Sequence, residues 1–188
     1  MPLGKVAGAR GRWLTKMLVY TTAGFVSAVA VGAALGAVGA LLLPPLLLVV
    51  LAVAVVALAR EAGLVRFPLP QPLRQTKDIW AKRYGGHTTA MLWGLDLGTV
   101  VSTRFTFAGT WVLILLPLLT GDPLLGVLAF ASCWLGRVAT VWIGPLFVPP
   151  GGSVVDLMDA IDTQHRSLRL TQVLGIALLI GYIVWTAW

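Results

Sequence analysis

The sequence predicts an all-α, polytopic membrane protein with about five transmembrane helices, one of them broken or re-entrant, and a cytoplasmic N-terminus. Its 188 residues are 58% hydrophobic and 11% charged, whereas soluble domains contain roughly 25% charged residues. The mean hydropathy is +0.90, and the apolar residues form long blocks separated by basic or proline-containing segments. This composition departs far from that of an ordinary soluble domain and predicts an integral membrane protein.

The first apolar block predicts a membrane-spanning helix. Residues 17–43 contain no charged side chain, and roughly 20 apolar residues suffice to cross the hydrocarbon core. The basic segment 1–16 before this block is also compatible with a cleaved signal peptide. However, the apolar region of a signal peptide has about 7 to 15 residues, and a second block follows Pro44-Pro45 at once. We therefore predict a retained helical hairpin over residues 17–59, preceded by a cytoplasmic N-terminus.

A basic, proline-containing segment over residues 60–85 is predicted to be a cytoplasmic linker. Pro68, Pro70 and Pro72 prevent a regular helix and favour extended chain. The basic residues around Trp80 suit a short helix on the membrane surface. A solvated linker is the simpler interpretation, and docking of a cytoplasmic protein is the alternative.

Residues 86–148 are predicted to form a broken helix and a return helix, with a turn at Gly121-Asp122-Pro123. Two short passes over residues 86–120 are the alternative, but each would have about 15 residues, which is short for a span. Residues 149–169 are predicted to be a second cytoplasmic linker, and residues 170–188 the last helix. All of these elements belong to a single transmembrane domain.

Basic residues predict the orientation of the chain. With a cytoplasmic N-terminus, the turns predicted to lie outside contain no lysine or arginine, and the cytoplasmic segments contain twelve. These twelve are Lys5, Arg10, Arg12, Lys16, Arg60, Arg66, Arg74, Lys77, Lys82, Arg83, Arg166 and Arg169. Such an excess is typical of cytoplasmic loops. The net charge of +7 therefore indicates topology and contact with the lipid bilayer, and nucleic-acid binding is not predicted.

Small residues recur every four positions in the first predicted helix. This spacing aligns small side chains along one ridge and permits close approach of another helix. The ridge consists of Gly24, Ala28, Gly32, Gly36 and Ala40. We interpret it as a helix-packing face, made either within the chain or with a partner subunit.

The apolar segment MLWGLDLGTVVSTRF, residues 91–105, contains two charged side chains, which are costly within a membrane unless they are paired or hydrated. Its glycines can break the helix, and its hydroxyl groups can satisfy the freed backbone. Asp96 is expected to pair with Arg137 if the helix is continuous, or with Arg104 if it folds back. The predicted intramembrane polar site contains Asp96, Thr99, Ser102, Thr103, Arg104 and Arg137. It would either line a polar path or form a buried pair that fixes helix register.

The order of these elements resembles a known family. A hairpin rich in small residues precedes the pattern RxxKxxWxxRYG, residues 74–85, and the glycine-broken GLDLGT, residues 94–99. This order is similar to the transmembrane domain of the CcdA and DsbD thiol-reductant transporters. The resemblance covers roughly residues 18–188. It implies two inverted repeats of three helices, each beginning with a broken helix that carries a proline-flanked cysteine.

Two departures separate the chain from that family's chemistry. Matching the order of elements leaves the first repeat without its opening helix. Ser102 and Thr103 occupy the neighbourhood of a family cysteine, and the chain has one cysteine, Cys133. A thiol relay alternates between a dithiol and a disulfide, which one cysteine cannot form within a chain. Cys133 is therefore interpreted as a small hydrophobic residue.

The sequence predicts no enzyme, because it contains no nucleophile or phosphate-binding motif, and it predicts no metal site and identifies no cofactor. The expected function is a non-catalytic structural or assembly subunit of a larger complex in the inner cell membrane. Its expected partners are other membrane chains or further copies of itself. One alternative is a conduit for a small solute or ion through residues 91–105. Another is a thiol relay completed by a partner's cysteine.

Overall fold

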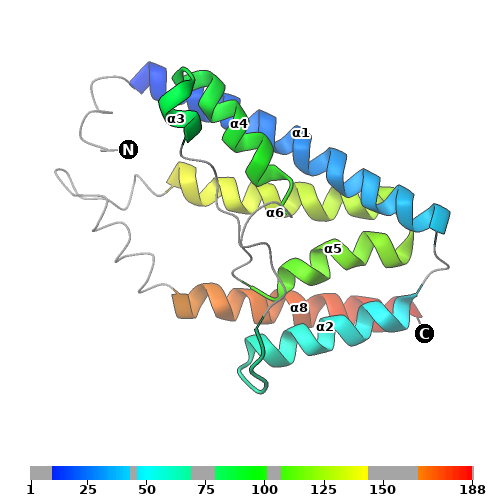
Figure 1. Cartoon of the computed structure of the whole chain (residues 1–188). Coiled ribbons are helices and arrows are strands. Elements are labelled where there is room, and N and C mark those ends of the chain that lie inside the picture. The colour runs from blue at the N-terminus through cyan, green and yellow to red at the C-terminus, as the bar shows by residue number, and fades with distance from the viewer. Residues whose placement is uncertain (1–9, 43–45, 69–78, 101–106, 144–164, 188) are drawn as a thin grey trace.

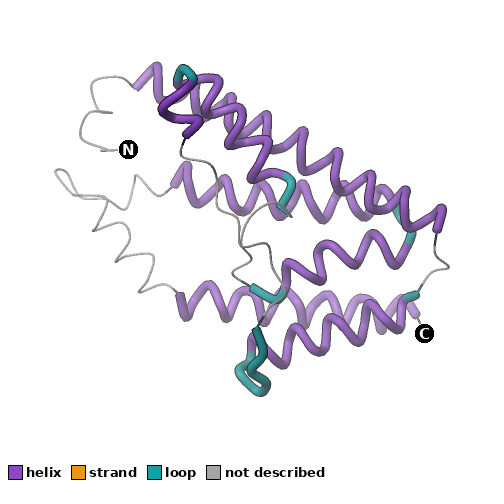
Figure 2. Tube along the Cα trace, viewed as in Figure 1, coloured by secondary structure: helices purple, strands orange, loops and turns teal. Residues whose placement is uncertain are grey.

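The computed structural model describes residues 10–42, 46–68, 79–100, 107–143 and 165–187. Within these ranges the regular elements are helices and there is no strand, as Figure 2 shows, so the all-α prediction is confirmed. The helices of the described ranges are α1 (Arg10–Leu42), α2 (Leu47–Glu61), α3 (Ile79–Arg83), α4 (Gly86–Gly98), α5 (Gly109–Thr120), α6 (Pro123–Ile143) and α8 (His165–Ala187).

Two of the described helices are long and apolar enough to cross a membrane. They are residues Trp13–Leu42 within α1 and Pro123–Ile143, which is α6. Helix α5 is apolar but shorter, with 12 residues. The length and composition of α1 and α6 are therefore compatible with a membrane protein.

Helix α1 is the central helix of one layer of the fold. It packs against α4 and α6 along much of its length, and also against α5, as Figure 1 shows. The core of this layer contains Ala28, Phe130 and Trp134, and the two aromatic side chains are fully buried. The indole of Trp134 donates a hydrogen bond of 2.9 Å to the carbonyl of Thr21, which ties α6 to α1.

A second layer contains α2, α5 and α8. Its core joins Ala54 and Ala57 of α2 to Val112 of α5 and Ile176 of α8. Although α1 and α2 are consecutive, α1 packs mainly on α4, α5 and α6, and α2 packs on α5 and α8. The residues predicted as a helical hairpin thus belong to two different layers.

Glycine residues bring α1 and α6 into backbone contact. A Cβ atom added at Gly32 would overlap the carbonyl of Gly126, and one added at Gly126 would overlap the carbonyl of Gly32. One turn further, a Cβ atom at Gly36 would come within 2.5 Å of Pro123. These positions accept no side chain, because backbone atoms occupy the space on the other side.

The same face of α1 contacts α4 near one end of the helix and α5 near the other. Gly24 lies against Gly98 of α4 as well as the indole of Trp134, and Gly39 faces the backbone of Leu118. Of the predicted ridge, four residues are buried, and Ala40 is exposed. Because the helix has 3.6 residues per turn, residues spaced four apart rotate gradually away from one face. At the end of the ridge Gly39 therefore occupies the buried position in place of Ala40.

The predicted broken tract forms two helices in the structure. Helix α4 ends at Gly98, and Val100 has a φ angle of 63°, a left-handed conformation that is rare for a β-branched residue. Helix α5 begins at Gly109. Helix α4 packs on α1, whereas α5 reaches the second layer and packs on α2. The break therefore moves the chain from one layer to the other.

Several helix boundaries differ from those predicted. Helix α1 begins at Arg10 and α8 at His165, rather than at residues 17 and 170. In both places basic residues continue the helix, because arginine and lysine are good helix formers. Helix α3 contains Trp80, where a short helix is predicted.

Candidate functional site

The predicted polar site is only partly within the described residues. Asp96 lies in the last turn of α4, Thr99 is the residue that follows that helix, and Arg137 lies on α6. Ser102, Thr103 and Arg104 lie outside the described residues.

Backbone groups at the end of α4 are satisfied by nearby hydroxyls. The hydroxyl of Thr99 donates a hydrogen bond of 2.8 Å to the carbonyl of Asp96. From α1, the hydroxyl of Ser27 donates one of 2.8 Å to the carbonyl of Leu95. The Oδ2 atom of Asp96 is buried. Hydroxyl side chains thus accompany the end of the helix.

Arg137 does not join this group. Arg137 is exposed on α6, and its backbone carbonyl accepts a hydrogen bond of 2.7 Å from the hydroxyl of Thr140. Within the described part of the chain, no ion pair connects Arg137 to Asp96. With the helix broken after Gly98, pairing of Asp96 with Arg104 stays a prediction.

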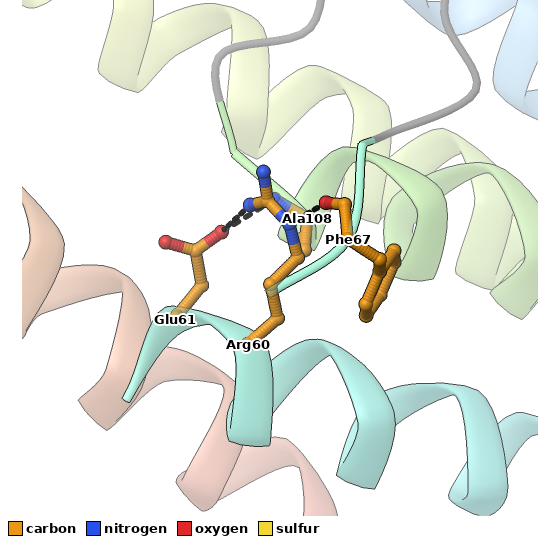
Figure 3. A network of polar contacts seen from close by, with 4 residues as sticks. All are labelled: Arg60, Glu61, Phe67 and Ala108. Atoms are coloured by element: carbon orange, nitrogen blue, oxygen red, sulfur yellow. Dashed lines mark hydrogen bonds and ion pairs between the residues drawn. The ribbon is translucent and has the colours of Figure 1, made fainter. Parts of the chain in front are cut away.

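A different carboxylate, Glu61, occupies a buried position at the start of α5. Glu61 is 5% exposed. Its Oε1 atom accepts a hydrogen bond of 2.7 Å from the backbone N–H of Ala108, as Figure 3 shows. Ala108 is the N-cap residue of α5, and no side chain of its own caps the helix. Glu61, from the last residue of α2, therefore caps α5 from outside.

Arg60 completes this arrangement, which we call the Glu61 cluster: Arg60, Glu61, Phe67 and Ala108. The Nη1 atom of Arg60 lies 3.0 Å from Oε1 of Glu61, and its Nε atom donates a hydrogen bond of 3.3 Å to the carbonyl of Phe67. The guanidinium carbon lies 5.7 Å from the centre of the Phe67 ring. One arginine thus connects the end of α2 to the chain that follows it (Figure 3).

The Glu61 cluster compensates charge at a helix end. The first N–H groups of a helix have no partner within the helix and carry a partial positive charge, and a carboxylate satisfies both requirements. Arg60 balances the remaining charge. Figure 1 shows that α2 ends and α5 begins part-way along α6 and α8, so the cluster lies within the length of the bundle.

Sequence analysis missed Glu61. The pair Arg60-Glu61 follows an apolar run directly, and two adjacent charges at such a place are read as the start of a solvated linker. The available signal was an acidic residue at the end of an apolar block, in a segment where basic residues predominate. The partner of Glu61 is 47 residues away in the chain, so no local pattern identifies it.

The other candidate groups are dispersed. Cys133 is a free thiol on α6 and is exposed. The Nε2 atom of His87 lies 3.2 Å from the hydroxyl of Thr15. The described residues contain no group of three or more histidine, cysteine, aspartate or glutamate side chains that could hold a metal ion. The arrangement is therefore suited to packing and charge compensation.

No protein-family model, curated protein sequence or solved structure significantly matches the chain.

Proposed function

We propose that the protein is a multi-pass inner-membrane protein and a non-catalytic structural or assembly subunit that works with other membrane chains. In this proposal α1, α2, α4 together with α5, α6 and α8 make five crossings, with the N-terminus in the cytoplasm. The proposal retains a relation in fold to the thiol-reductant transporters. Their relay chemistry is left out, because the chain has one cysteine.

The observation that carries the proposal is an apolar groove between α5, α6 and α8. It has a volume of about 300 Å³, and small residues line it on all three helices. These are Gly109, Ala129 and Gly175. A Cβ atom added at Gly175 would meet no atom within 4 Å. Small residues permit close approach between membrane helices, so the groove suits a helix of a partner chain.

The Glu61 cluster favours a subunit over a conduit. In transporters with broken helices, the exposed N-terminus of a half-helix binds an anionic group of the substrate. Here a carboxylate of the chain itself occupies the start of α5, at 2.7 Å from the Ala108 nitrogen. The start of α5 is thus already neutralised, which supports a structural role for the break.

The proposed topology predicts the accessibility of two positions. On a Cys133→Ser background, a cysteine at position 75 should react with a membrane-impermeant maleimide only after the cells are permeabilised. A cysteine at position 122 should react in intact cells. The reason is the excess of basic residues in the segments assigned to the cytoplasm. Labelling of position 75 in intact cells would reject the five-crossing arrangement.

The proposed groove predicts a position-dependent loss of partner. Gly175→Leu should lower the yield of a co-purifying membrane chain at least about five-fold in mild detergent, because the side chain fills the groove and costs more than 1 kcal/mol of packing. Gly136→Leu is the matched control, since a Cβ atom there also meets open space but Gly136 does not line the groove. Quantitative mass spectrometry measures the yield. Equal yields from both variants would contradict the proposed groove.

A small-solute or ion conduit is the second candidate. It is favoured by the break between α4 and α5 and by the buried Oδ2 atom of Asp96 near that break. Such a conduit would purify as a homo-oligomer of uniform size and would carry solute in vesicles without a partner chain. A subunit would show no flux alone.

A further inference from the structure

A second apolar groove lies between α2 and α5. It has a volume of about 330 Å³, within the range of roughly 300 to 1,000 Å³ typical of ligand sites. Six of its lining residues are Ala52, Val53 and Val56 from α2, Trp111 and Leu115 from α5, and Phe67. No charged or hydroxyl-bearing side chain is among the described residues that line it. This lining excludes a hydrated solute and suits a hydrocarbon chain.

Two arginines and a glutamate lie close in the chain to Phe67, one of the groove's lining residues. Phe67 lines the groove, and the guanidinium of Arg60 lies 5.7 Å from its ring centre. Arg66 precedes Phe67 and is exposed. Together Arg60, Glu61 and Arg66 contribute two positive charges and one negative charge, a net charge of +1. The apolar groove thus adjoins a segment of net positive charge, which is the complement of an anionic amphiphile.

We propose that this groove binds an anionic phospholipid, with an acyl chain between α2 and α5 and the phosphate at Arg66, next to the Arg60–Glu61 pair. Guanidinium groups suit phosphate because their N–H donors match its oxygens in pairs. The proposed orientation places residues 60–66 on the cytoplasmic side, where anionic lipids attract basic residues next to membrane helices. The lipid site goes beyond the proposed subunit function and rests on its topology for the choice of leaflet.

The test measures which phospholipid the purified full-length chain retains. The chain is equilibrated in mixed micelles with equal amounts of phosphatidylglycerol and phosphatidylcholine of identical acyl chains, and retained lipid is counted by native mass spectrometry. We expect about five times more phosphatidylglycerol than phosphatidylcholine per chain, the factor expected for one net positive charge near an anionic surface. At constant ionic strength, an equimolar amount of inorganic phosphate should displace little phosphatidylglycerol, because it gains nothing from the apolar groove.

Two variants separate the groove from its charge. Val56→Trp fills the groove without changing the charge, and Arg66→Gln removes one positive charge without changing the groove. Arg66→Gln should lower retained phosphatidylglycerol about five-fold, to the level of phosphatidylcholine. Val56→Trp should lower the retention of both lipids, because both use the same acyl chains. Val55→Trp and Arg83→Gln are the matched controls, because both residues are exposed and neither lines the groove. They should keep the wild-type ratio. The elution volume of every variant in size-exclusion chromatography checks its fold.

Four results would overturn the lipid site. These are equal retention of the two lipids by the wild-type chain, loss in only one of the two variants, loss in the controls as well, and displacement of the lipid by phosphate. The assay uses the chain without a partner, whereas the subunit proposal is tested by co-purification and by labelling of positions 75 and 122. Failure of the lipid site and failure of the proposed function are therefore distinguishable.

Discussion

Replacing Gly32 by alanine is expected to destabilise the fold strongly. The new Cβ atom would overlap the carbonyl oxygen of Gly126. Backbone on the opposite side cannot rotate away as a side chain can, so two helices must separate. Overpacking of this kind costs about 1 to 3 kcal/mol or more, and we expect the upper end of that range. The free energy of unfolding is measured by tryptophan fluorescence during titration with a denaturing detergent.

The reciprocal change provides a second test of the same contact. Gly126→Ala should produce a similar loss, because its Cβ atom would overlap the carbonyl of Gly32. Gly136→Ala, on the same helix as Gly126, is the control and meets no atom within 4 Å. It should be neutral or more stable by up to about 1 kcal/mol, since alanine favours helix over glycine. Three equal stabilities would show that α1 and α6 do not meet at these glycines.

Glu61→Ala is expected to cost roughly 3 to 5 kcal/mol, the range for removal of one partner from a buried ion pair. The change leaves the N–H of Ala108 without the acceptor that lies 2.7 Å away and Arg60 without its carboxylate. Glu61→Gln should cost less, because an amide oxygen can still accept the Ala108 hydrogen bond. The measured quantity is again the free energy of unfolding in detergent.

A double mutant distinguishes the ion pair from the cap. The double mutant Arg60→Gln with Glu61→Gln should lose less free energy of unfolding than the sum of the losses in the two single mutants, because no uncompensated charge remains. Arg83→Gln, an exposed arginine on α3, is the control and should change stability by less than about 0.5 kcal/mol. If Glu61→Ala were as mild as this control, Glu61 would not stabilise the start of α5.

Composition and spacing predicted the helical class of the fold and a break somewhere within residues 91–105, and α4 ends there at Gly98. They succeed there because apolar blocks and glycine positions are local properties of the sequence. The small-residue ridge also has a local signal, and the structure places Gly24, Gly32 and Gly36 in close contact with other elements. The contact partners of these glycines, such as Gly126, cannot be identified from the local sequence, because the contacts depend on how the two layers are arranged.

The candidate site was predicted less well, for a physical reason. Attention fell on Asp96 because it interrupts an apolar stretch, whereas Glu61 stands at the edge of one. Burial of Glu61 depends on α5, whose start is 47 residues further along the chain. Arg137 lies within an apolar tract but is exposed on α6. The apolar or charged character of the sequence neighbours therefore does not show whether a charged residue is buried. Its burial depends on which helices pack around it.

The reciprocal contact of Gly32 with Gly126 has a consequence for biosynthesis. The two glycines are separated by 94 residues, from 126 − 32, and a ribosome adds about 5 to 20 residues per second. The glycine face of α1 therefore has no α6 to cover it for roughly 5 to 20 seconds after it is made. Helix α2 also lacks its packing partners during this time, because α5 and α8 are synthesised later. A nascent chain stopped before α6 would keep this face open, and such chains are expected to depend on a chaperone that covers apolar helices.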